Sequence, residues 1–470
     1  MTLLEVFIGS VGEWLKPTVL KTVVPQGTVG SNPTASSSLE GTMINKNILS
    51  DTFTYEDEYG NVTSREEIYS VIDRWKSLLI ERGAKRGNSL GVSLVMVSIN
   101  HLALVIAAGE LGMRLVLLDK PICQETIPAT KAAIFAPIDY HVMDVYLLAN
   151  EAYAEMVHRY CTVNIMENEI LEHSDEVSDI FGTEDDVYLC GSTSGTTGQG
   201  QIVEFTQKDC FDLALRNVNV FGFTEHSVVC HTRNMHHVSC MLTFMLPSLM
   251  VTKKHYYYNI YHDPAGLFAF MRDKQVDQVF FGSHFVVEDM IASDVVFDVT
   301  PKINLSGYTV PEEYIVYCKK HNVEFMSHYG SVDTGIPLLL NHVTEDSEYI
   351  PNWLGKEPDD YYEIVWSPHT GRASVGGPTF ECREIQDCIN PRSGGMWCHF
   401  GRLDKNVTEE VLRAVTGKDL TVIDEHIVFW EDCNFSRDCK YHVHHLDKKT
   451  WTTETKINLH QLRYYLQNTA

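Results

Sequence analysis

The first strongly patterned part of the chain carries apolar side chains at helical spacing. The side chains of this stripe are Ile68, Ile72, Trp75 and Leu79. Positions three and four apart share one face of an α-helix, so the stripe predicts a helix over residues 64–82 that buries one face. Ser64 is a favoured N-cap residue, and Gly83 is a favoured residue for ending a helix.

Apolar runs of strand length alternate with helical patterns through most of the chain. Residues 90–97 form such a run, Asn100 begins a helical pattern that ends near Gly112, and residues 115–118 form the next run. The further expected strands cover residues 187–190, 276–281, 303–305, 323–326, 363–366, 396–400, 426–430 and 441–445. Apolar strands separated by helices are typical of sheets covered on both faces, so the pattern predicts an α/β protein.

The composition is that of a globular protein and narrows the range of partners. Of 470 residues, 44% are hydrophobic and 21% are charged, and the formal net charge is -26. Nucleic acids and anionic membrane surfaces attract cationic proteins, so this charge argues against both as partners. The most apolar stretch, residues 94–118, contains His101, Glu110 and Arg114. It predicts a buried strand–helix–strand and no membrane span.

The cysteines and the beginning of the chain indicate where the protein works. Twelve cysteines are scattered without a Cys-x-x-Cys pair, and the chain does not begin with a secretory signal, so we expect reduced thiols in the cytoplasm.

Residues 1–42 differ in character from the rest, and DNA encoding residues 30–34 would resemble the T-arm of a transfer RNA gene. We therefore expect residues 1–42 to be a non-native or disordered extension, with Met43 as the true start.

The most informative segment follows the expected strand at residues 187–190. Seven consecutive residues, Ser192 to Gly198, are all serine, threonine or glycine. Small residues allow a tight turn in which main-chain N–H groups and side-chain hydroxyls converge, and such a concavity suits phosphate oxygens. No Gly-Lys-Ser/Thr follows, so this is not a Walker loop. A flexible polar linker is the simpler alternative.

This segment and later motifs resemble the adenylate-forming enzymes. That family includes acyl-CoA synthetases, firefly luciferase and the adenylation domains of peptide synthetases. The resemblance implies that the loop binds phosphates through Thr193, Ser194, Gly195, Thr196, Thr197 and Gly198. The family continues its loop with Pro-Lys, where this chain has Gly200 and Gln201.

Further motifs occur in the order expected for the family. Residues 329–333 resemble its Tyr-Gly-x-Thr-Glu motif, and the resemblance implies that Tyr329 stacks on adenine beside Gly330. Asp333 would hold magnesium and act in catalysis with Thr197. Val332 stands where the family has a threonine whose hydroxyl meets the α-phosphate, so Ser331 or Thr334 would make that contact.

The remaining site residues are also implied by the resemblance. His237, in residues 235–239, and Ser306 would contact the acid, and the adenine-side loop would contain Gly307 and Tyr308. The nucleotide would further be held by Asp387, on the ribose hydroxyls, and by Arg402; Asp404 would be the hinge and Lys456 the catalytic lysine. Amino-acid-activating relatives carry an aspartate at the position of His237, which disfavours α-amino acids as substrates.

The resemblance also implies the domain organisation and the chemistry. We expect a large multi-sheet α/β adenylation domain at residues 43–402 and a small, shortened α+β lid at residues 403–470. The implied reaction uses ATP and Mg2+ to activate a small-molecule carboxylic acid as an acyl-adenylate, with release of pyrophosphate. CoA or a carrier protein is a candidate acceptor for a second step. The rival hypothesis, motivated by Gln201, Val332 and the short lid, is a degenerate nucleotide-binding or interaction protein without catalysis.

Several features have simpler interpretations. Zinc ligands could come from Cys230, His231, His236, His237 and Cys240, or from His442, His444 and His445. No paired cysteine spacing supports a zinc site, so hydrogen-bonded histidines are the preferred interpretation.

The acidic pairs Asp185-Asp186 and Asp359-Asp360 are expected in solvated turns. The apolar residues Met241, Phe244, Met245 and Met250 are expected in the core.

Overall fold

The computed structural model describes most of the chain from Met43 onward. The described residues all belong to one compact unit, Leu39–Ala470. They are residues 43–94, 98–117, 130–135, 161–166, 181–192, 202–232, 238–258, 266–281, 284–307, 309–335, 337–367, 372–378, 380–385, 387–392, 396–402, 419–423, 426–430, 442–446, 452–453 and 456–457. The expectation for residues 1–42 lies outside these residues and stays a prediction.

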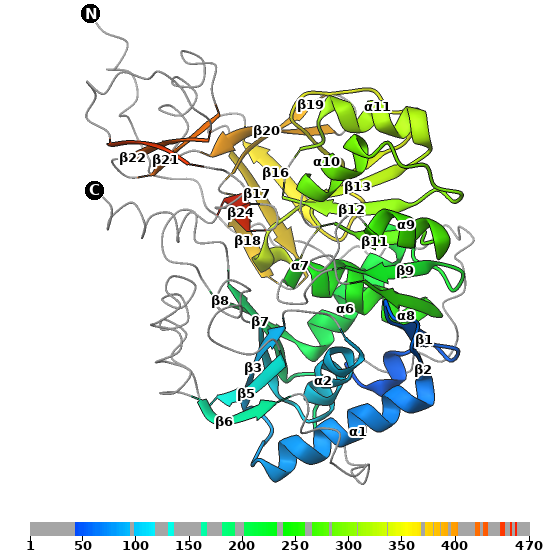
Figure 1. Cartoon of the computed structure of the whole chain (residues 1–470). Helices are drawn as coiled ribbons and strands as arrows, with labels where there is room; N and C mark the ends of the chain where they lie inside the picture. Colours follow the sequence, from blue (N-terminus) through cyan, green and yellow to red (C-terminus); the bar gives the residue numbers. More distant parts are fainter. Residues whose placement is uncertain are drawn as a thin grey trace, which may run out of the picture. The chain divides into compact units, whose positions relative to one another are not determined.

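A six-stranded sheet carries the strand that leads into the Ser/Thr/Gly segment. Its order is β6 (Cys161–Met166), β5 (Thr130–Phe135), β3 (Ser89–Leu94), β4 (Arg114–Leu117), β7 (Val187–Ser192) and β8 (Ile202–Thr206). The central strands β3, β4 and β7 are parallel, and β5, β6 and β8 are antiparallel to their neighbours. The helices α1 (Arg65–Glu81) and α2 (Ile99–Glu110) pack on each other in this part of the chain (Figure 1).

Helix α1 confirms the predicted apolar stripe. Ser64 closes a capping box, because its hydroxyl accepts from the main-chain N–H of Glu67 and the Glu67 carboxylate accepts from the N–H of Ser64. Gly83 adopts a positive φ of 87°, which a residue without a Cβ tolerates best. The predicted stripe residues Ile68, Ile72, Trp75 and Leu79 are all buried.

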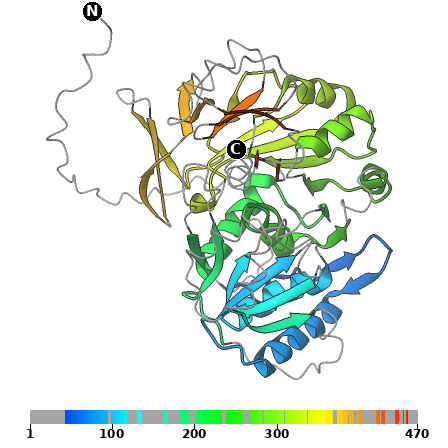
Figure 2. The same cartoon turned by 60° about the vertical axis from the view of Figure 1, so that its left-hand side comes forward.

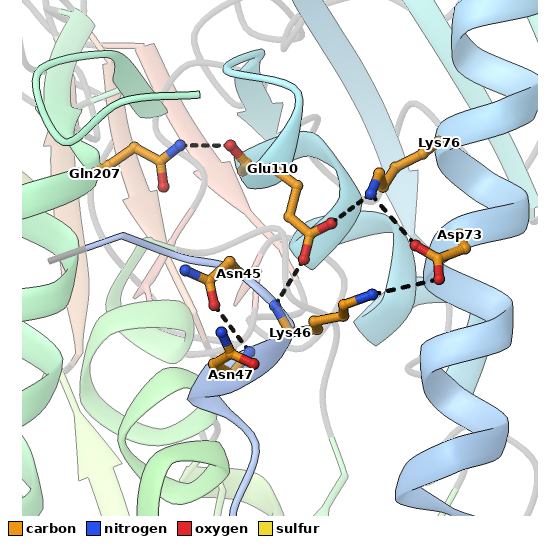
Figure 3. A network of polar contacts seen from close by, with 8 residues as sticks. Asn45, Lys46, Asn47, Asp73, Lys76, Glu110 and Gln207 are labelled. Atoms are coloured by element: carbon orange, nitrogen blue, oxygen red, sulfur yellow. Dashed lines mark hydrogen bonds and ion pairs between the residues drawn. The ribbon is translucent and has the colours of Figure 1, made fainter. Parts of the chain in front are cut away.

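Charged groups are buried where the first two helices meet the beginning of the described chain. Figure 3 shows the Glu110 carboxylate between the Lys76 ammonium, at 2.8 Å, and the main-chain N–H of Lys46, at 2.9 Å. Asp73 pairs with both lysines, at 3.3 and 3.4 Å. Gln207 bonds Ile44 and Gly109 as well. The segment η1 (Lys46–Ile48) and its flanks are therefore part of the folded core.

The second large sheet has eight strands. Its order is β14 (Leu339–Val343), β13 (Glu324–Tyr329), β12 (Lys302–Ser306), β11 (Gln278–Phe280), β9 (Val228–His231), β10 (Lys254–Tyr257), β1 (Thr54–Glu56) and β2 (Val62–Ser64). Only the edge strands β14 and β2 are antiparallel to their neighbours. Figure 2 shows both large sheets from a second direction.

Alternate residues of this sheet belong to two separate cores. Val229 and Met326 lie in a core shared with α1, α2, α6 (Gln207–Phe221), the π-helix η3 (Met241–Met245) and α8 (Leu246–Val251). Cys230 and Phe325 lie in a second core with α9 (Gly266–Asp273), α10 (His284–Ala292) and α11 (Glu312–His321). Side chains on the two faces of a strand point in opposite directions, so the sheet is covered on both faces, as predicted. The apolar residues of 241–250 are core residues, also as predicted.

Smaller sheets follow β14. The first contains β15 (Trp353–Gly355), β20 (Met396–Arg402) and β19 (Asp387–Arg392), and the next contains β16 (Glu363–Ser367), β17 (Arg372–Gly377) and β18 (Phe380–Glu384). Beyond residue 402 lie β21 (Leu420–Ile423), β22 (His426–Phe429) and β23 (His442–His445), and the pair β24 (Thr452–Thr453) and β25 (Lys456–Ile457). The predicted α/β class with several sheets is confirmed; the boundary at residue 402 stays a prediction.

Candidate active site

The Ser/Thr/Gly segment begins at a point of very close packing. Residues 193–198 lie outside the described residues, but Gly191 and Ser192 at the end of β7 lie within them. A Cβ added to Gly191 would lie 2.2 Å from Cγ2 of Val238 and 3.4 Å from Cγ1 of Val332. Val238 begins α7 (Val238–Cys240), and Val332 begins the 3-10 turn η4 (Val332–Thr334). The strand before the segment therefore meets two other predicted site segments, 235–239 and 329–333.

Two neighbouring parallel strands end at the predicted adenine-side residues. Ser306 is the last residue of β12 and lies opposite His328, the residue before Tyr329 in β13. Gly307 follows with a positive φ of 91°, a conformation that favours glycine. Ligands of open α/β sheets bind at the carboxyl ends of the strands, so this edge is a suitable place for a nucleotide. Tyr308 and His237 lie outside the described residues.

The turn after β13 places the two hydroxyls that could replace the family's threonine in different surroundings. Thr334 is buried, donates to the carbonyl of Ser331 at 2.8 Å and accepts from the N–H of Ser331 at 3.2 Å. Its hydroxyl is therefore occupied within the turn. Ser331 is exposed, and its side chain accepts from the main-chain N–H of Thr334 in a capping box. Its own O–H can still donate to a ligand, because a hydroxyl is both an acceptor and a donor. Asp333 stands between them in η4, and only its main chain is described.

Tyr329 and Gly330 connect this edge to the predicted ribose-binding residue. Tyr329 is partly buried and packs against an apolar cluster that contains Ile385 and Ile389, which flank Asp387 in the sequence. The carbonyl of Tyr329 accepts from the N–H of Leu338 at 2.8 Å. Asp387 and Arg402 are direct partners in the β19–β20 register. Tyr329 and the strands that carry Asp387 and Arg402, through Ile389 and Trp397, therefore share one apolar cluster.

The C-terminal site residues are placed less completely. Lys456 lies in β25, opposite Thr453. Of Asp387, Arg402 and Lys456 the main chain is described, and Asp404 and Thr197 lie outside the described residues. Their roles stay predictions.

Buried histidines line the same face of the large sheet. His328 packs between Phe221, at 5.5 Å between ring centroids, and Phe280, at 6.2 Å. Burial lowers its pKa to about 3. His255 donates from Nε2 to the carbonyl of Thr252 at 3.0 Å, so its Nδ1 accepts from Nε2 of His231 at 3.1 Å. Burial lowers the pKa of His255 to about 4, and these imidazoles are neutral at physiological pH.

No metal cluster is seen among the described side chains. They contain no group of three or more histidine, cysteine, aspartate or glutamate side chains that could hold a metal ion. His231, one of the zinc candidates, bonds His255 instead. His442 lies beside His426 in the β22–β23 register, and His236 and His237 lie outside the described residues.

Two acidic pairs differ from the prediction of solvated turns. Asp185 and Asp360 are exposed, but their neighbours are ion-paired. Asp186 pairs with Arg86 at 2.8 Å, and Asp359 pairs with the buried Arg216 at 2.7 Å. The partners lie 100 and 143 residues away in sequence, so local composition gives no indication of them.

Comparisons with known proteins rest on structure alone. No family model and no curated protein matches the sequence. The structure matches ATP-bound MatB from Rhodopseudomonas palustris at a TM-score of 0.65 and 15% identity, covering 90% of this chain and 99% of that one. It matches the anthranilate CoA ligase AuaEII in complex with anthranoyl-AMP at 0.66 and 12%, covering 93% and 100%.

A third match contains a metal ion. O-succinylbenzoate coenzyme A synthetase (MenE) from Bacillus subtilis, in complex with ATP and magnesium, gives a TM-score of 0.65 at 14% identity, covering 86% of this chain and 95% of that one.

Among the described residues, no helix is long and apolar enough to cross a membrane.

Proposed function

We propose, from the premise that this chain has the fold of the adenylate-forming acyl-CoA synthetases, that it joins a carboxylic acid to AMP. A carboxylate oxygen attacks the α-phosphorus of ATP and forms a new P–O bond. The bond from that phosphorus to the β-phosphate breaks, and pyrophosphate leaves. The acid is thereby converted into an acyl-adenylate, in which AMP is a good leaving group.

The observation that carries this proposal is the contact at Gly191. The strand that leads to the Ser/Thr/Gly segment packs directly against Val332, the residue before Asp333. A phosphate-binding loop and a magnesium-binding carboxylate must lie close together, because both act on one triphosphate. The packing supports that arrangement although neither the loop nor the carboxylate of Asp333 is itself described.

The residues present fit a magnesium–ATP complex. Asp333 supplies a carboxylate of the kind that magnesium prefers, on a short turn whose main chain is hydrogen-bonded. A bound magnesium ion neutralises charge on the phosphate oxygens. In this proposal Thr193 to Gly198 orient the departing pyrophosphate, with Thr197 acting in catalysis, and Ser331 meets the α-phosphate. Tyr329, Gly330, Gly307 and Tyr308 face adenine, Asp387 and Arg402 hold the ribose side, and His237 and Ser306 contact the acid.

Lys456 would complete the site from the C-terminal segment. A lysine near the reacting atoms stabilises both the acid's carboxylate and the developing charge on the α-phosphate. In the proposal Asp404 is the hinge that lets this segment approach. AuaEII is a CoA ligase and MenE a coenzyme A synthetase, and CoA or a carrier protein is the candidate acceptor here.

The exposed hydroxyl of Ser331 favours catalysis over the degenerate alternative. Val332 lacks the hydroxyl of the family motif, and Thr334 is occupied within the turn. If Ser331 were buried as well, the α-phosphate would have no hydroxyl partner in this turn. Because Ser331 is exposed, its hydroxyl can meet the α-phosphate as the enzyme hypothesis requires.

The experiment is acid-dependent exchange of radiolabelled pyrophosphate into ATP, over a panel of aliphatic, aromatic, hydroxy, dicarboxylic and amino acids. We expect exchange with at least one acid other than an α-amino acid. Lys456→Ala should lose activity on the order of 100-fold, because a charge on the reacting atoms is removed. Lys448→Ala, a lysine in the same segment, is the matched control and should retain it. Tight binding of magnesium–ATP without exchange for any acid would favour the non-catalytic alternative.

A further inference from the structure

A buried arginine on α6 contacts the segment that follows the candidate magnesium residue. The Arg216 side chain is only 6% exposed and forms a bidentate pair with Asp359, at 2.7 and 2.8 Å. Its guanidinium carbon lies 4.9 Å from the ring centroids of both Tyr361 and Tyr362. We name these four residues the Arg216 clamp. A planar guanidinium can pair and stack at once, which the point charge of a lysine cannot do.

The clamp holds the chain on the C-terminal side of η4. Arg216 donates to the carbonyl of Pro337 at 3.0 Å, and the Tyr362 hydroxyl donates to the carbonyl of Thr334. Burial raises the pKa of Tyr362, so this hydroxyl keeps the proton it donates. Both acceptors are main-chain atoms within four residues of Asp333.

The same helix presses on the turn from a second position. Gly335 ends η4 with a positive φ of 64°, and a Cβ there would lie 2.5 Å from Cδ1 of Leu213. Leu213 is three residues before Arg216, so both side chains lie on one face of α6. Helix α6 therefore fixes the turn through one apolar and one charged contact.

We propose that Arg216 is a positioning residue that sets where η4 presents Asp333 and Ser331 to magnesium–ATP. This rests on the proposed function. A buried ion pair adds little net stability, because burying two charges costs about as much as their attraction returns. One nitrogen of the guanidinium, Nη1, is buried without a hydrogen-bond partner among the described residues. The arrangement is thus better explained by the geometry it imposes than by stability.

The test compares Arg216→Lys and Tyr362→Phe with the wild-type full chain. In pyrophosphate exchange, both variants should need a higher magnesium concentration for half-maximal rate, by about tenfold for Arg216→Lys, because small displacements of catalytic groups cost large factors in rate. Tyr362→Phe removes only one hydroxyl and keeps both rings, so it folds if Arg216→Lys does not.

The matched control is a second buried ion pair far from the site in sequence. Lys76→Met/Glu110→Gln removes the pair between α1 and α2, whose members are fully buried. This double variant should change the melting temperature without changing the magnesium dependence. An equal shift of the magnesium dependence in the control would overturn the proposal, because general destabilisation would then explain it.

A second measurement separates this proposal from the proposed function. Amide hydrogen exchange of residues 331–338 needs no substrate, and in both clamp variants these amides should exchange faster than in the wild type. Unchanged exchange there, together with unchanged magnesium dependence, contradicts the clamp. If the wild type neither binds magnesium–ATP nor exchanges pyrophosphate, the proposed function fails, while the amide measurement still decides whether Arg216 holds the turn.

Discussion

His328 is a buried imidazole whose two ring nitrogens have no hydrogen-bond partner among the described residues. Its pKa is lowered to about 3 by burial, and that of His255 to about 4 by the same cause. Unfolded histidine takes up a proton near pH 6.5, whereas the folded protein keeps both rings neutral at that pH. These two histidines therefore leave the free energy of unfolding unchanged above pH 6.5. Below that pH, they lower it progressively as the pH drops from 6.5 toward 4.

This gives a prediction for stability. Each of the two histidines should lower the free energy of unfolding by about 1 kcal/mol per pH unit below pH 6. Urea denaturation at pH 7.5, 6.5 and 5.5 measures it. His328→Leu should flatten the dependence and leave stability at pH 7.5 unchanged or higher, because no hydrogen bond to a described residue is lost. A dependence as steep as the wild type's would show that His328 does not carry it.

For some single residues, burial and hydrogen-bond partners could not be predicted from the sequence. Residues 331–334 contain two hydroxyls that were candidates for the α-phosphate, Ser331 and Thr334, and no local pattern distinguished them. The turn geometry occupies Thr334 and exposes Ser331. Likewise Asp359 resembles any acidic turn residue until the fold brings Arg216 to it. Burial and pairing across many residues are properties of the folded chain and not of a local pattern.

Among the helices and strands, local sequence patterns predicted best those elements whose bounds depend on nearby residues. Helix α1 has a capping residue, a stripe and a terminating glycine within one stretch of sequence, and its bounds agree with the prediction to one residue. The strands β7, β12 and β13 were predicted from apolar runs but extend one to three residues beyond them, to Ser192, Ser306 and Tyr329. Those extensions are polar or aromatic residues at the site edge, where ladder hydrogen bonds outweigh residue preference.

The meeting of β7, α7 and η4 gives an element-scale prediction. Gly191→Ala places a Cβ against Val238 and Val332, which pushes the three elements apart, so pyrophosphate exchange should fall by about tenfold or more. Val238→Ala removes the atom 2.2 Å away and leaves the Val238 Cβ at 3.5 Å, an ordinary contact.

The rescue variant makes that test specific. Gly191→Ala/Val238→Ala should recover most of the activity, and Val238→Ala alone is its control. If the double variant is as impaired as Gly191→Ala, the loss comes from something other than the Val238 contact, and the packing of β7 against α7 does not position the site.

At the scale of the whole molecule, the predicted α/β architecture is confirmed by the two large sheets and by matches to solved ligases over 86–93% of the chain. A sequence 12–15% identical to those proteins keeps their fold because packing tolerates substitution when apolar positions are kept. The site is only partly predictable in this way, because its segments follow several different strands. The acid and its acceptor depend on side chains that the motifs do not specify.

We propose above all that these strand ends form one site for ATP and an acid. Its most direct measurement is acid-dependent pyrophosphate exchange by the wild type beside Asp333→Asn. We expect exchange that depends on both an acid and magnesium, and a loss on the order of 100-fold in Asp333→Asn, because a carboxylate that holds magnesium is replaced by a neutral amide. Exchange that is absent for every acid, or equal in the two proteins, would contradict it.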